Sequence, residues 1–214
     1  FKPASDTPNC AVEFVKLLEK AGVPKGVVNM VTGPGEKVGK EIVTNKNVRM
    51  ISFTVSRDTG EWITKNTGVK KVSLEMGGKN GIIVMDDADL GLALDGIIWG
   101  AFGTTGQRCT AASRIIVHSS VKDKLLRALV ERTKKLSLGS GLLKTTDVGP
   151  LINAKAVEKC VNYMQVGEDE GAKLLCGGKR PKGRGFFFEP TIFDEAQAIM
   201  RIAREEIFGP VLSV

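Results

Sequence analysis

Short apolar, strand-like runs alternate with helix-like segments along the whole chain, and this alternation most constrains the fold. Strands separated by helices of this length favour right-handed crossovers and a parallel sheet. The sequence therefore predicts an α/β protein. The predicted strands are 27–31, 50–54, 71–75, 81–85, 114–118 and 173–178, followed by an extended aromatic stretch at 185–193. The predicted helices lie at 8–21, 58–66, 89–98, 120–136 and 154–167, and a glycine turn at 33–39 opens a short further helix.

The length and the glycine pattern indicate two parts. A chain of 214 residues is long enough for one large domain or two small ones. The adjacent glycines Gly77 and Gly78 interrupt the regular alternation between two predicted strands. We therefore expect a first domain over residues 1–77 and a second over residues 78–214.

The charge and hydropathy of the chain argue against two classes of partner. The net charge is +7, but the excess is spread over the chain, with 12 basic and 8 acidic residues in 1–77. No aromatic platform or zinc-finger spacing accompanies it, so binding of nucleic acid is the weaker alternative. No run of 18 apolar residues occurs, which excludes a predicted membrane span.

The four cysteines, Cys10, Cys109, Cys160 and Cys176, are far apart, and the chain has a single histidine, His118. This composition predicts no metal site. Free thiols without a secretory signal indicate a reducing, cytoplasmic environment. We expect three of the four thiols to pack as small apolar side chains.

Cys109 differs from the other cysteines in its neighbours. It lies in the run GTTGQRCTAASR, residues 103–114, after the polar pair Gln107 and Arg108. A cation beside a thiol favours the thiolate, and the small residues that follow leave room for a helix N-terminus or a close ligand. From the residues alone, a nucleophile and a packed core thiol remain about equally supported.

Two carboxylate positions are candidates for acid–base chemistry. Glu75 ends a predicted strand next to flexible glycines, where α/β proteins place catalytic groups, although a surface glutamate at a turn fits equally well. Glu205 and Glu206 are adjacent, which by itself is more typical of a solvated pair. The turn GPGEKVG, residues 33–39, suits a phosphate but lacks the complete glycine pattern of a dinucleotide site.

The order of these motifs along the chain resembles that of the aldehyde dehydrogenase superfamily. The segments that carry the resemblance are Lys2 to Ser5, GVVNMVTGPG, SFTVS, LEMGGKN, GQRCTAASR and EEIFGPV. They cover essentially the whole chain, and LEMGGK followed some thirty residues later by GQRC is the most specific pair. The resemblance implies a partial Rossmann-like cofactor domain with a parallel sheet, followed by a partial α/β catalytic domain. It also implies a core fragment that lacks both ends of the usual chain.

The resemblance further implies NAD(P)-dependent oxidation of an aldehyde, semialdehydes included, to a carboxylic acid. Cys109 would be the nucleophile that forms a thiohemiacetal and then a thioester, and Glu75 would activate the hydrolytic water. The parent enzyme would be a homo-oligomer that acts on a small aldehyde. The residues implied to contact NAD or NADP are Lys2, Ser5, Ser56, Met76, Glu206 and Phe208.

Two positions depart from the family pattern. Val55 replaces a glycine beside the cofactor, and its branched side chain would crowd the pyrophosphate or require another backbone angle. Ser5 replaces a glutamate that is common in NAD-preferring members, which favours tolerance of NADP. The alternative to a working enzyme is therefore a catalytically inert core fragment.

Overall fold

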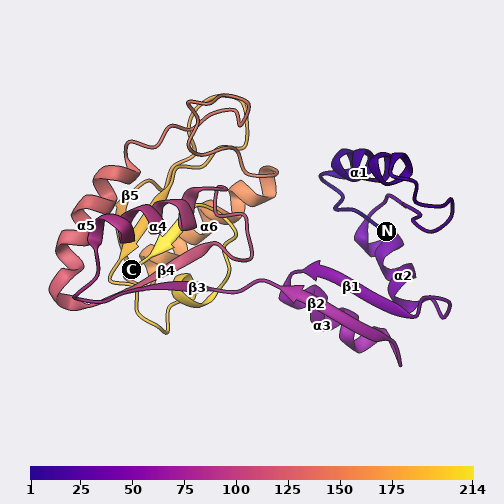
Figure 1. Ribbon diagram of the computed structural model, residues 1–214. Helices are drawn as coiled ribbons and strands as arrows, with labels where there is room; N and C mark the ends of the chain where they lie inside the picture. Colours follow the sequence, from indigo (N-terminus) through magenta and orange to yellow (C-terminus); the bar gives the residue numbers. More distant parts are fainter. The chain divides into compact units, whose positions relative to one another are not determined.

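The computed structural model describes all 214 residues, which form two compact units, Phe1–Met76 and Gly77–Val214. The sequence predicts the boundary between the two domains at the glycine pair Gly77 and Gly78. Each unit has its own sheet (Figure 1). No helix in the structure is long and apolar enough to cross a membrane.

Unit 1 contains a two-stranded parallel sheet. Strands β1 (Met50–Val55) and β2 (Lys71–Met76) pair in register from Met50 opposite Lys71 to Val55 opposite Met76, and α3 (Arg57–Asn66) connects them. Helix α1 (Pro8–Lys20), the π-helical turn η1 (Gly35–Gly39) and α2 (Lys40–Thr44) precede the sheet. A small core of Val43, Ile51 and Ile63 holds α2, β1 and α3 together.

The strand predicted at 27–31 is wrong. Residues 27–31 form turns and irregular backbone, and Val27 is 66% exposed. Apart from local bonds to Pro24 and Gly26, the segment bonds to the chain start, where Val31 N donates to the Phe1 carbonyl and the Phe1 amino group donates to the Asn29 carbonyl. An apolar run becomes a buried strand only where neighbours cover it, and this unit supplies none.

Unit 2 is built on a five-stranded sheet in the order β3-β4-β7-β6-β5. Its strands are β3 (Asn80–Val84), β4 (Ala112–Val117), β5 (Lys173–Cys176), β6 (Thr191–Asp194) and β7 (Val211–Ser213). All neighbours are parallel except β5, which runs antiparallel to β6. The predicted α/β class and parallel pairing are therefore confirmed, with one antiparallel edge strand and with a short central strand, β7, that the sequence did not predict.

Helices cover both faces of this sheet. The helices are α4 (Leu90–Phe102), α5 (Ser119–Thr133), α6 (Ala154–Asp169) and the short α7 (Arg201–Arg204) (Figure 1). Successive strand residues face opposite sides, and in β6 the fully buried Ile192 joins the core of α4 and α5, whereas Phe193 joins the core of α6 and α7. The sheet is therefore the middle layer of a three-layer unit.

The helix starts follow simple capping chemistry. The Asp89 carboxylate accepts hydrogen bonds of 2.8 and 3.1 Å from the Gly91 and Leu92 amides, which stabilises the start of α4 by about 1 kcal/mol. The His118 ring nitrogen Nδ1 caps α5 through the Ser120 amide, so the single histidine has a structural role. These caps fix where the chain leaves β3 and β4.

The central position of β7 generates a stability prediction. Leu212 is fully buried in β7, so we expect Leu212→Ala to leave a cavity and lower the free energy of unfolding of unit 2 by about 2–5 kcal/mol. Urea denaturation followed by far-UV circular dichroism measures the loss. Leu142→Ala is the matched control because Leu142 is 95% exposed. Equal stability of the two variants would contradict the assigned layering.

Candidate functional site

Cys109 lies in the turn that connects α4 to β4, and its side chain is exposed. Of the two alternatives that the small residues after Cys109 left open, a helix N-terminus is not formed, because the chain passes through a turn at Thr110 and enters β4 at Ala112. Cys160 and Cys176 are buried and Cys10 is exposed, so two cysteines, rather than the expected three, pack as apolar side chains. Burial raises the pKa of the Cys160 thiol to about 12, which leaves it protonated and unreactive.

Hydrogen bonds to two other segments hold this turn in place. Asn80 Nδ2, at the start of β3, donates to the Cys109 carbonyl at 2.6 Å and to the Ala111 carbonyl at 3.2 Å. Gln107 bonds to the loop before α6, donating to the Pro150 carbonyl at 3.3 Å and accepting from the Ile152 amide at 2.9 Å. The turn is therefore fixed on both sides of its exposed thiol.

The same turn packs against the segment before β7 through two glycines. A Cβ on Gly106 would lie 2.1 Å from the Gly209 carbonyl oxygen, and Gly106 has a φ of +66°. Its neighbour Thr105 is buried and has a φ of +58°, a rare conformation for a β-branched residue. The Thr105 hydroxyl donates to the Gly149 carbonyl at 3.1 Å, which helps to hold that conformation.

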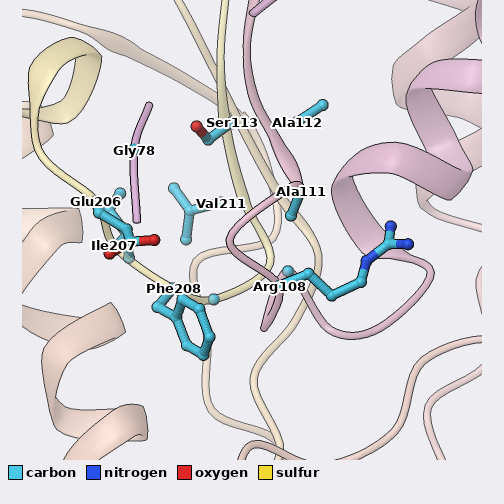
Figure 2. A pocket seen from close by; sticks show the side chains of 11 residues that line it. Gly78, Arg108, Ala111, Ala112, Ser113, Glu206, Ile207, Phe208 and Val211 are labelled. Atoms are coloured by element: carbon cyan, nitrogen blue, oxygen red, sulfur yellow. The ribbon is translucent and has the colours of Figure 1, made fainter. Parts of the chain in front are cut away.

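Glu206 and Phe208 lie on the other side of this contact. Both residues line a small hollow with Gly78 and Arg108, and Figure 2 shows Glu206 beside Gly78 with the Phe208 ring at the rim. The hollow encloses about 10 Å³, the space of one water. Phe208 has a φ of +58°, so an aromatic residue is held in strained backbone at the edge of the hollow.

Gly77 makes room for the Glu206 carboxylate. A Cβ on Gly77 would lie 2.1 Å from Glu206 Oε2, so only glycine lets the carboxylate rest on this backbone. The Lys159 ammonium donates to the Glu206 carbonyl at 2.7 Å and fixes the backbone of the same residue. Glu206 is therefore placed by contacts to both its main chain and its side chain.

The adjacent glutamates have different surroundings, so they are not a simple solvated pair. Glu205 accepts a hydrogen bond of 2.6 Å from the Tyr163 hydroxyl and is bridged by Arg201 at 3.0 Å. These hydrogen bonds, Arg201 foremost, lower the pKa of the Glu205 carboxyl. Glu205 ties the segment to α6 and α7, and Glu206 is left at the hollow.

Lys79 was not singled out by the sequence analysis as a site residue. Its Nζ is shielded from solvent and has no hydrogen-bond partner. Burial, and then the positive charges of Arg114 and Lys159, lower its pKa from 10.5 to about 8, against the opposing effect of Glu206 and Glu205. An unpartnered ammonium shielded from solvent next to the glycine pair costs free energy.

The remaining predicted residues belong to unit 1. Glu75 and Met76 end β2 and are exposed, and the Met76 sulfur lies against Gly60 of α3. Ser56 is the N-cap residue of α3, and its hydroxyl donates to the Thr59 hydroxyl at 3.1 Å. Val55 pairs with Met76 as an ordinary strand residue without positive φ, so it needs no unusual backbone angle.

Ser5 lines a hollow of unit 1, and Lys2 directly precedes the first lining residue, Pro3. The hollow has a volume of about 410 Å³ and is lined by Pro3, Ala4, Ser5 and Pro8 on one side and by residues 32–35 on the other. The Ser5 hydroxyl donates to the Gly33 carbonyl at 3.4 Å, and Lys2 Nζ donates to the Pro3 carbonyl at 2.7 Å. The space is large enough for part of a nucleotide.

In unit 2, the structure thus packs the turn that carries Cys109 against the segment of Glu206 and Phe208. The remaining predicted residues, Lys2, Ser5, Ser56, Glu75 and Met76, lie in unit 1. No group of three or more His, Cys, Asp or Glu side chains is arranged to hold a metal ion.

Comparison with known proteins decides the family. The profile of the aldehyde dehydrogenase family matches residues 1–214. The chain belongs to the aldehyde dehydrogenase family. A betaine aldehyde dehydrogenase of Bacillus subtilis is 48% identical over 219 residues, and a 2,5-dioxopentanoate dehydrogenase of Saccharolobus solfataricus is 44% identical over 217 residues.

Solved structures of this family agree with the fold. A betaine aldehyde dehydrogenase from Staphylococcus aureus, crystallised in complex with NAD+, superposes with a TM-score of 0.96 at 42% identity. This match covers 100% of the present chain and 43% of that enzyme, and the two curated relatives are each covered to 45%. The chain therefore spans less than half the length of the aldehyde dehydrogenases that it matches.

Several residues that build the surroundings of Cys109 and Glu206 could not be picked out from the sequence. Asn80 is one polar residue at the start of a strand, and nothing in its spacing links it to Cys109. Lys159 lies on an amphipathic helix among other charged residues. Only Gln107 carried a signal, because it is a polar residue two positions before an isolated cysteine.

The contact between Gly106 and Gly209 generates a prediction about stability. Gly106→Ala introduces a Cβ against the Gly209 carbonyl and at a positive φ, so we expect the free energy of unfolding to fall by about 2–3 kcal/mol. Urea titration of the purified chain measures it. Gly141→Ala is the control, because no heavy atom lies within 4 Å of a Cβ there. An unchanged midpoint in Gly106→Ala would refute the contact.

Lys79 generates a pH-dependent prediction. The folded chain binds the Lys79 proton less tightly than the unfolded chain does, so the cost of the buried charge is complete below pH about 8 and disappears as the pH rises to about 10.5. We expect Lys79→Met to stabilise unit 2 by about 1–3 kcal/mol at neutral pH and by less at alkaline pH. Thermal unfolding across this pH range is compared with the exposed-site control Lys135→Met. A gain that does not depend on pH would contradict the assignment.

Proposed function

We propose that this chain is the segment of an NAD-dependent aldehyde dehydrogenase that carries the catalytic thiol, with Cys109 as nucleophile and Glu75 as general base. The observation that carries the proposal is the state of Cys109. It is an exposed thiol in a turn whose backbone is fixed by Asn80 and Gln107. A nucleophile held in one geometry reacts faster because less motion must be lost on the way to the transition state.

The residues present fit a dinucleotide. In unit 1, Lys2 and Ser5 adjoin a hollow of suitable size and Ser56 stands at the N-terminus of α3, where backbone N–H groups favour phosphate. In unit 2, Glu206 is placed at the rim of a hollow by the absence of a Cβ on Gly77. We propose that Lys2, Ser5, Ser56, Met76, Glu206 and Phe208 hold the cofactor. The structural relative in complex with NAD+ supports NAD, and tolerance of NADP through Ser5 stays a prediction.

The proposed chemistry assigns separate tasks to the two catalytic residues. The Cys109 thiolate adds to the aldehyde carbon and forms a thiohemiacetal, so that the substrate is covalently attached before oxidation. A dinucleotide held by these residues would supply the hydride acceptor needed to oxidise this adduct to a thioester. Glu75 then takes a proton from water, the resulting nucleophile attacks the thioester carbon, and the C–S bond breaks to release the acid and the Cys109 thiolate.

The substrate is a small aldehyde. The curated relatives include enzymes named for betaine aldehyde and for the semialdehydes 2,5-dioxopentanoate and α-ketoglutaric semialdehyde. The motif around Cys109 favours the semialdehyde group, so both substrate types belong in an assay. We further propose a homo-oligomeric parent enzyme in a reducing cytoplasm, which is consistent with four free cysteines.

The test transplants the chain into a complete homologue. Residues 1–214 replace the matching segment of the Bacillus subtilis betaine aldehyde dehydrogenase, and formation of reduced dinucleotide is followed with betaine aldehyde and with semialdehydes. We expect Cys109→Ala to lower kcat by about 10⁴-fold or more. We expect Glu75→Gln to give one rapid turnover and then a slow phase, because a missing general base costs about 10²–10⁴-fold in hydrolysis.

Cys10→Ala is the matched control, since Cys10 is the other exposed thiol. Full activity of that control together with loss in Cys109→Ala supports the assignment. Activity retained without Cys109 would overturn it. A folded hybrid that turns over no aldehyde, even with Cys109 intact, would favour the inert core fragment.

A further inference from the structure

Arg108, the residue directly before Cys109, is attached to the helix that precedes the turn. Its guanidinium carbon lies 4.0 Å from the centre of the Trp99 ring, and Nη2 donates a long hydrogen bond of 3.4 Å to the Trp99 carbonyl. Figure 2 shows the Arg108 side chain leading away from the hollow towards a helix. The cation expected to act on the neighbouring thiol is therefore used in a stack on α4.

The stack is close, although Trp99 is on the surface. The Trp99 side chain is 64% exposed, whereas Arg108 Nε is shielded from solvent and has no hydrogen-bond partner. A planar guanidinium can lose hydration where an aromatic ring covers its face, because the cation–π attraction offsets that loss. A lysine could place its charge near the ring, but only the flat guanidinium of an arginine can stack on it.

The two sides of Cys109 are restrained by different elements. On the far side, Asn80 of β3 holds the Cys109 carbonyl at 2.6 Å. On the near side, the Arg108 side chain is the link to α4. Gln107 also anchors this side of the turn, to the loop before α6, but the Arg108 contact is the one made by the residue directly before the thiol.

We propose that Trp99 and Arg108 form a positioning clamp for Cys109, in which the indole ring holds the guanidinium on α4 and thereby fixes the residue before the thiol. This inference rests on the proposed function for its catalytic meaning. Arg108 and Trp99 are positioning residues in it, and neither contacts the reacting atoms. Release of the clamp has two consequences: the turn loosens, and the freed cation can approach the thiolate.

The experiment uses the 214-residue chain with Cys10→Ser, so that Cys109 is its only exposed thiol. The variants are Trp99→Leu, Trp99→Phe, Arg108→Gln, the double variant Trp99→Leu with Arg108→Gln, and Leu92→Ala. Leu92 is the control because it is 73% exposed on the same helix. Hydrogen exchange of residues 104–111 and the pH profile of alkylation by iodoacetamide are measured for each.

Trp99→Leu and Arg108→Gln are each expected to speed hydrogen exchange in 104–111, and the double variant is expected to exchange no faster than either, because one contact is lost in all three. Trp99→Phe keeps a ring and is expected to behave as the parent.

Trp99→Leu alone is expected to lower the pH midpoint of alkylation by about half a unit, which raises the rate below the midpoint about threefold, because the freed guanidinium favours the thiolate. The double variant has no such cation and is expected to keep the parent profile.

The proposal is overturned if Trp99→Leu and Arg108→Gln leave the exchange of 104–111 unchanged, if Leu92→Ala raises it equally, or if the two effects add in the double variant. Circular dichroism shows whether each variant folds, and Arg108→Gln carries the test should Trp99→Leu unfold. Because these measurements need neither cofactor nor aldehyde, their failure is distinguishable from the failure of the proposed function. The proposed function fails only if the transplanted enzyme keeps its activity after Cys109→Ala.

Discussion

The contact between the backbones of Gly106 and Gly209 is the constraint on which the arrangement of unit 2 depends. It joins the turn of Cys109 to the segment of Glu206 and Phe208, which are about a hundred residues apart in sequence. Any side chain at Gly106 would occupy the position of the Gly209 carbonyl, and a side chain at Gly209 would meet the buried sulfur of Cys160. Two missing Cβ atoms therefore set the distance between the thiol's turn and the residues proposed to hold the cofactor. The strained backbone of Thr105 and of Phe208 flanks this contact on both sides, which is typical of functional sites.

The site of unit 2 lies at the amino ends of its strands. Asn80 begins β3, Cys109 precedes β4, and Glu206 precedes β7. Because these three strands are parallel, their beginnings share one edge of the sheet, and segments distant in sequence meet there. Open α/β sheets usually bind ligands at the opposite edge, where strands end. Glu75 of unit 1 follows that usual rule, since it stands near the end of β2.

The outcome of the sequence analysis follows from this geometry. The α/β class, most helices and most strands were predictable because apolar periodicity and caps such as Asp89 act locally. The wrong strand at 27–31 and the missed β7 have one cause, since burial by neighbouring strands decides whether an apolar run becomes a strand. Cys109, Glu206 and Phe208 were reached through the resemblance. Asn80, Lys159 and Trp99 were not, because their partners lie 29, 47 and 9 residues away and hydrogen-bond geometry leaves no trace in spacing.

The charged side chains around the site interact with partners other than the Cys109 thiol. Arg108 is held by Trp99, Lys159 donates to a backbone carbonyl, and Glu205 is neutralised by Arg201. Lys79 is the exception, a buried ammonium with no hydrogen-bond partner whose pKa is lowered to about 8. A fold keeps such a group only where the surrounding packing compensates for the cost of the charge. The charges of Glu206 and Glu205 raise the pKa of Lys79, but by less than burial and the neighbouring cations Arg114 and Lys159 lower it.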